Sequence, residues 1–74
     1  MKLQQIRKNK NLSQSQLAKS AGISTQVLQR YEMGFRNIDG AKLETLCNLA
    51  IALDCKLSDI IEDAGLIEKV QQTT

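Results

Sequence analysis

The stretch of sequence that decides the fold is SQSQLAKSAGISTQVLQRYEMG, residues 13–34. Ser13 lies one residue before an apolar pattern of helical spacing, and Gln16 follows three residues later, as in a capping box. A helix that begins here should end at Gly22, because glycine adopts the left-handed backbone of a helix C-terminus without steric cost. The sequence therefore predicts a short helix over residues 14–21.

A second short helix is predicted directly after the first. Ser24 can accept a hydrogen bond from a free backbone N–H at the start of a helix, and Gly34 can end it, so this helix should cover residues 25–33. Ala18 and Gly22 are small, which lets two helices cross at a steep angle beside a tight turn. Together the two segments predict a helix-turn-helix.

The outer face of the second helix carries side chains that suit DNA. Leu28 and Tyr31 should anchor the opposite side in the core. At 100° per residue, one exposed face holds four hydrogen-bonding residues: Thr25, Gln26, Gln29 and Arg30. In the major groove, glutamine can form two hydrogen bonds with adenine and arginine two with guanine. We interpret the four as base-reading residues for double-stranded DNA; the alternative is a helical hairpin with no role in DNA binding.

Apolar residues at helical spacing continue on both sides of this stretch. They predict a first helix over about residues 2–10. A fourth helix is expected over about residues 40–53, with Asp39 as its cap. A short fifth helix should begin at residue 57 or 58 and run to residue 63, because residues 64–65, alanine and glycine, should break it.

The length and patterning point to one all-α domain. A chain of 74 residues can bury one small core, and no segment shows the period-two alternation of a strand. We therefore predict a five-helix DNA-binding domain over residues 1–63. Residues 64–74 should form a C-terminal apolar segment and tail.

Charge is divided unevenly along the chain. Residues 1–36 hold seven basic and one acidic side chain, a net charge of +6, whereas residues 37–74 hold three basic and seven acidic ones, a net charge of −4. A polyanion such as DNA should therefore bind the first half. The acidic half should face away from it or hold a second protein.

Several classes of protein are disfavoured by the composition. No apolar run approaches a membrane span, and the polar start lacks the apolar stretch of a secretory signal, so a cytoplasmic location is expected. Cys47 and Cys55 match no common zinc or redox spacing, and the chain has no histidine, so we expect no metal and no cofactor. The serines have no visible general base, which argues against an enzyme.

Beyond these patterns, the sequence resembles a known family. Residues 12–24 and 27–34 are similar to the phage repressor/Cro group of helix-turn-helix proteins, also called the xenobiotic-response-element family. The likeness continues through residues 43–53 and 57–61 and covers about residues 2–63. It implies a five-helix repressor-like domain, a role in repressing or activating transcription, and a homodimer on a palindromic operator.

The resemblance also assigns roles to single residues. Base reading falls on Thr25, Gln26 and Arg30, with Gln29 beside them. Contacts to DNA phosphates are expected from Gln14, Ser24, Arg36 and Asn37. Phe35 stands where a polar or basic residue is common, so the loop around it should contribute less than usual. Arg7 and Glu32 should form an ion pair that ties the first helix to the third.

Dimerisation is expected from an excess of apolar residues. The candidate interface residues are Leu57, Ile61, Leu66, Ile67 and Val70. They exceed what so small a core can bury, unless residues 64–70 fold back on the first helix of the same chain. The alternative function is an antitoxin-like module that binds another protein through its acidic half, with DNA binding secondary.

Overall fold

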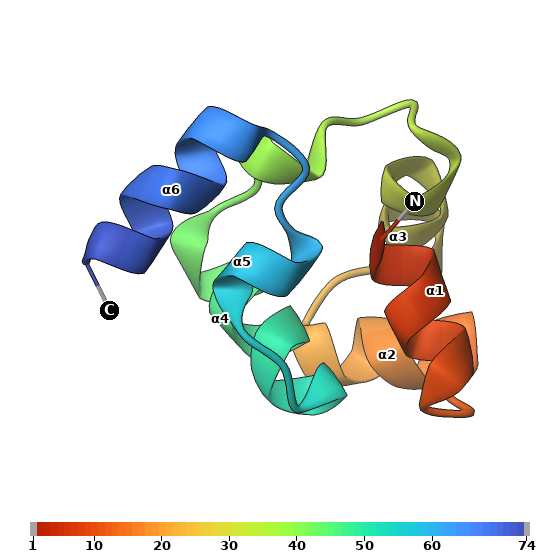
Figure 1. The fold of residues 1–74 in the computed structure, drawn as a ribbon. Helices are drawn as coiled ribbons and strands as arrows, with labels where there is room; N and C mark the ends of the chain where they lie inside the picture. Colours follow the sequence, from red (N-terminus) through yellow and green to blue (C-terminus); the bar gives the residue numbers. More distant parts are fainter. Residues whose placement is uncertain (1, 74) are drawn as a thin grey trace.

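The computed structural model describes residues 2–73, which form an all-α fold, as predicted (Figure 1). The elements in this part of the chain are α1 (Lys2–Asn9), α2 (Gln14–Ala21), α3 (Thr25–Met33), the 3₁₀ turn η1 (Ile38–Gly40), α4 (Leu43–Leu53), α5 (Leu57–Ile60) and α6 (Ala64–Gln72). The first five α-helices correspond to the five that were predicted. α6 is an additional helix.

The ends of α2 and α3 form as the sequence predicts. The Ser13 hydroxyl accepts a hydrogen bond from the Gln16 backbone N–H at 3.1 Å, and the Ser13 backbone N–H donates to Gln16 Oε1 at 2.9 Å, which completes the capping box. Ser24 Oγ accepts from the Val27 N–H at 3.2 Å. Gly22 and Gly34 end the two helices in the left-handed conformation, with φ of 72° and 81°. A residue with a Cβ atom would be strained in this conformation.

A core of leucine and isoleucine side chains holds the helices together. α4 packs against α2, and α5 packs against α1, α4 and α6. The largest fully buried side chains are Leu3, Leu17, Leu28, Ile38, Leu49, Leu53, Ile60 and Ile61. Each such side chain contributes roughly 1.5–3 kcal/mol when it leaves water. Leu28 is the member of this set that lies on α3, so burial fixes which face of α3 turns outward.

The predicted start of the fourth helix is wrong. α4 begins at Leu43, and Asp39 lies in η1 instead of capping α4. Its carboxylate accepts from the backbone N–H groups of Glu62 and Asp63, at 2.8 and 2.9 Å. Two hydrogen bonds to the segment between α5 and α6 satisfy this carboxylate better than a single cap would.

The predicted break at residues 64–65 is also wrong. α5 ends at Ile60, and Asp63 caps α6 by accepting from the Leu66 N–H at 2.9 Å. An N-cap side chain that accepts a hydrogen bond from the backbone N–H three residues later stabilises the start of a helix. Ala64 and Gly65 therefore lie in the first turn of α6. In Figure 1, α6 lies on the opposite side of the fold from α2 and α3.

Candidate nucleic-acid interface

α3 has one buried and one exposed face. Leu28, Tyr31 and Glu32 are buried, with exposed fractions of 0%, 7% and 4%. Three of the predicted base-reading residues, Gln26, Gln29 and Arg30, are exposed, and the fourth, Thr25, is half-buried. The polar edge of α3 is therefore open to a ligand along most of its length.

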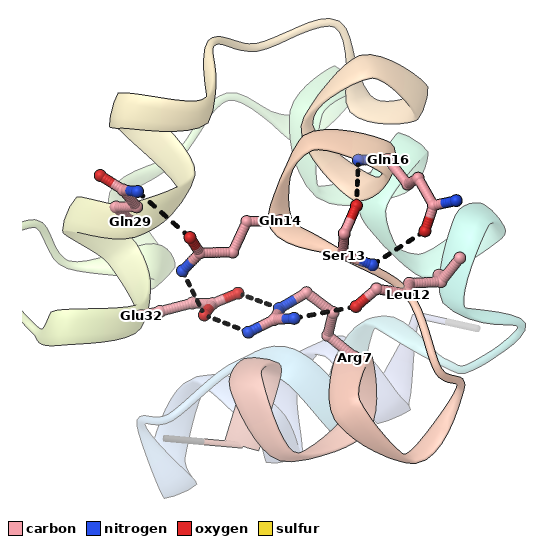
Figure 2. A network of polar contacts seen from close by, with 7 residues as sticks. All are labelled: Arg7, Leu12, Ser13, Gln14, Gln16, Gln29 and Glu32. Carbon is pink, nitrogen blue, oxygen red and sulfur yellow. Dashed lines mark hydrogen bonds and ion pairs between the residues drawn. The ribbon is translucent and has the colours of Figure 1, made fainter.

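A buried ion pair fixes α3 against the first helix (Figure 2). Arg7 Nε donates to Glu32 Oε2 at 2.7 Å and Arg7 Nη2 donates to Glu32 Oε1 at 3.0 Å. Arg7 Nη1 donates to the backbone oxygen of Leu12 at 2.8 Å. One guanidinium thus joins α1, the approach to α2, and α3. A bidentate ion pair of this kind holds the guanidinium and the carboxylate in one relative orientation.

Gln14 extends this network to the exposed edge of α3. Its Nε2 donates to Glu32 Oε1 at 3.1 Å, and its Oε1 accepts from Gln29 Nε2 at 3.2 Å (Figure 2). The network therefore connects two residues predicted to touch DNA, one at the start of α2 and one on α3. The sequence does not predict this link, because the two glutamines are fifteen residues apart on different helices. No local spacing rule reports such a contact.

The loop after α3 is tied to the end of that helix. The backbone N–H groups of Phe35 and Arg36 both donate to the Arg30 backbone oxygen, at 2.9 and 3.2 Å. The Arg36 guanidinium lies over the Tyr31 ring, 5.7 Å from its centroid. This contact holds the cation near the exposed end of α3. Phe35 is 75% exposed.

The residues predicted to contact phosphates lie on three neighbouring segments. Gln14 begins α2, Ser24 caps α3, and Arg36 and Asn37 belong to the loop before η1. Ser24, Arg36 and Asn37 are exposed and Gln14 is half-buried. Asn37 Oδ1 accepts from the Asp39 N–H at 3.0 Å, which fixes its side chain. Each segment adjoins an end of α2 or α3.

The predicted dimer residues differ in exposure. Ile61 is only 2% exposed and belongs to the chain's own core, so it offers no surface to a partner. Leu57, Leu66, Ile67 and Val70 are half-buried. Residues 64–70 pack against α5 within the same chain, and no residue of α6 is fully buried.

Within residues 2–73, no group of three or more cysteine or acidic side chains could hold a metal ion. Burial raises the pKa of the Cys55 thiol, and the Asp59 carboxylate raises it further, so this cysteine stays protonated at neutral pH. None of the helices in this part of the chain has the length and apolar character needed to cross a membrane.

The comparison with known families identifies the kind of domain. Residues 3–60 match a family model described as "Helix-turn-helix", which spans nearly all of α1 and the whole of α2 to α5. α6 lies outside the matched range. No curated protein and no solved structure matches the chain.

Proposed function

The chain belongs to the helix-turn-helix family, as a DNA-binding domain of the Cro/C1 type, and from this premise we propose that it regulates transcription by reading a specific sequence of double-stranded DNA. In this proposal α3 enters the major groove. The groove is wide enough for one helix, so the side chains on the polar edge of α3 reach the base edges. These side chains are Thr25, Gln26, Gln29 and Arg30.

The observation that carries the proposal is the division of α3 into two faces. Its buried face is anchored by Leu28, Tyr31 and the ion-paired Glu32, so the helix presents one fixed polar edge. A base-reading helix needs this rigidity, since hydrogen bonds to bases depend on the position of each donor and acceptor.

The surrounding residues suit the DNA backbone. Gln14 begins α2, Ser24 caps α3, and Arg36 and Asn37 lie in the loop that follows α3. Contacts from such positions to phosphates would set the register of α3 in the groove without reading sequence. The net charge of +6 over residues 1–36 supports this arrangement.

A homodimer on an inverted repeat is the form we propose for the bound protein. The half-buried apolar residues Leu57, Leu66 and Ile67 lie on α5 and α6, where a second copy could cover them, and α6 is on the opposite side of the fold from α3 (Figure 1). Two-fold symmetry would place the two copies of α3 about 34 Å apart, one turn of DNA. The DNA site should then contain two half-sites in opposite orientation.

Arg30→Ala tests the reading edge. We expect it to weaken binding to the preferred duplex by about 1–3 kcal/mol and to relax the preference at one base pair, because a two-bond contact with guanine is lost. Competition titrations with duplexes that differ at single positions would measure both effects.

The matched control is Lys69→Ala, which removes an exposed cation from α6. It should change neither the affinity nor the base preference. If Arg30→Ala weakened the preferred duplex and a random duplex equally, Arg30 would contribute charge alone and the proposed reading role would be lost.

A further inference from the structure

We propose that Glu32 and Gln14 are positioning residues that fix the amide orientation of Gln29, so that Gln29 reads adenine rather than guanine. The inference rests on the proposed function, because it concerns how the same edge of α3 chooses a base. It is carried by the direction of the hydrogen bonds in Figure 2.

The chain of hydrogen bonds begins at a group that can only accept. The Glu32 side chain is fully buried, and both of its oxygens accept hydrogen bonds from the Arg7 guanidinium, so it meets Gln14 as an acceptor. Gln14 approaches Glu32 Oε1 at 3.1 Å. Only the NH₂ end of the Gln14 amide can face a carboxylate, and this fixes the orientation of Gln14.

The orientation of Gln14 in turn fixes that of Gln29. With its NH₂ group turned to Glu32, Gln14 presents its carbonyl oxygen to α3, and Gln29 Nε2 donates to it at 3.2 Å. A reversed Gln29 would bring two carbonyl oxygens together, which is repulsive. The carbonyl oxygen of the exposed Gln29 and its second amide hydrogen are therefore left for the groove.

This presentation matches one purine and not the other. Adenine offers a donor at N6 and an acceptor at N7, which pair with the free oxygen and the free hydrogen of the amide. Guanine offers acceptors at both O6 and N7, so the Gln29 oxygen would face another acceptor. The buried charge of Glu32 thus influences base choice from a position that touches no base.

Gln14→Lys is the variant that reverses the chain. Lysine donates and cannot accept, so it can bind Glu32 but forces Gln29 to turn its oxygen inward and its NH₂ group outward. We expect the wild type to bind adenine about fivefold or more tightly than guanine at the base pair read by Gln29, and Gln14→Lys to reverse this preference by about the same factor. Fivefold is the lower end of the discrimination that a bidentate contact provides. Selection from a random duplex library, followed by titration of single-position variants, measures this change.

Three further variants complete the experiment. Gln29→Ala identifies the base pair, because its preference should disappear there. Ser15→Lys adds the same charge at an exposed neighbour on α2 that takes no part in the network, and should keep adenine. Gln14→Leu removes the acceptor for Gln29 and should bring adenine and guanine to within about twofold, so the proposal is tested even if the lysine variant does not fold.

The outcomes separate this inference from the proposed function. If the wild type enriches a motif and Gln14→Lys or Gln14→Leu keeps the same preference for adenine, the inference is overturned while the proposed function stands. An unchanged preference in Gln29→Ala at every base pair overturns it as well. If the wild type enriches no motif at all, both fail.

Discussion

Glu32→Ala is expected to lower the free energy of unfolding by about 3–5 kcal/mol, because it leaves the charge of Arg7 buried without its partner. Arg7 is only 8% exposed and uses two nitrogens to bind the Glu32 carboxylate. For a domain of this size, whose total stability is a few kcal/mol, such a loss would leave much of the protein unfolded at 25 °C. Urea denaturation followed by circular dichroism measures it.

The control for this prediction removes both charges. Arg7→Leu combined with Glu32→Leu should cost less than Glu32→Ala alone, because two apolar side chains leave no unpaired charge in the protein. Solvent-exposed ion pairs contribute less than about 1 kcal/mol to the free energy of unfolding, so Glu32→Ala would cost no more than this if the pair were on the surface. A loss this small would contradict the buried and structural role given to this contact.

Leu28→Ala is expected to lower the free energy of unfolding by about 2–5 kcal/mol, the usual cost of a cavity left by a fully buried leucine. Leu28 is 0% exposed and anchors α3 to the core. Affinity for the preferred duplex should fall as well, since the reading edge depends on the position of α3. Thermal denaturation and titration at a temperature where the variant is folded would separate the two effects.

Leu28→Met is the matched variant, because it keeps the volume and the apolar character of the side chain. It should cost less than about 1.5 kcal/mol and preserve DNA binding. Equal and small losses in both variants would mean that the packing of Leu28 does not fix α3, and would contradict its assigned role.

The parts of the fold that sequence could predict are those determined by local chemistry. Ser13 with Gln16 and Ser24 with Val27 are contacts within one turn, and Gly22 and Gly34 end helices through their own backbone freedom. Each depends on residues close in sequence, so spacing alone was sufficient. The apolar pattern then determined which side of α3 would be buried.

The misplaced elements depend on contacts between distant residues. Asp39 is a suitable helix cap by its type, but the fold brings residues 62 and 63 within reach of its carboxylate. Gly65 normally weakens a helix, but Asp63 provides a cap just before it, and α6 gains further support by packing on α5. In both places tertiary contacts outweighed local preference.

The candidate site also has features that local sequence predicts and features that depend on contacts between distant residues. Helical periodicity predicts a polar edge on α3, and of its four residues Gln26, Gln29 and Arg30 are exposed while Thr25 is half-buried. The hydrogen bond between Gln14 and Gln29 joins two helices across the turn and depends on their crossing angle. Its direction depends on the buried charge of Glu32, which no periodicity reports.

The central claim, that this chain reads a specific DNA sequence, is tested most directly by selecting bound duplexes from a random library with the wild-type protein. We expect one enriched motif made of two inverted half-sites about one helical turn apart, and Arg30→Ala should relax the preference at a single base pair in each half. A motif without symmetry would remove the dimer but not the reading of sequence. Equal recovery of all sequences would contradict the central claim.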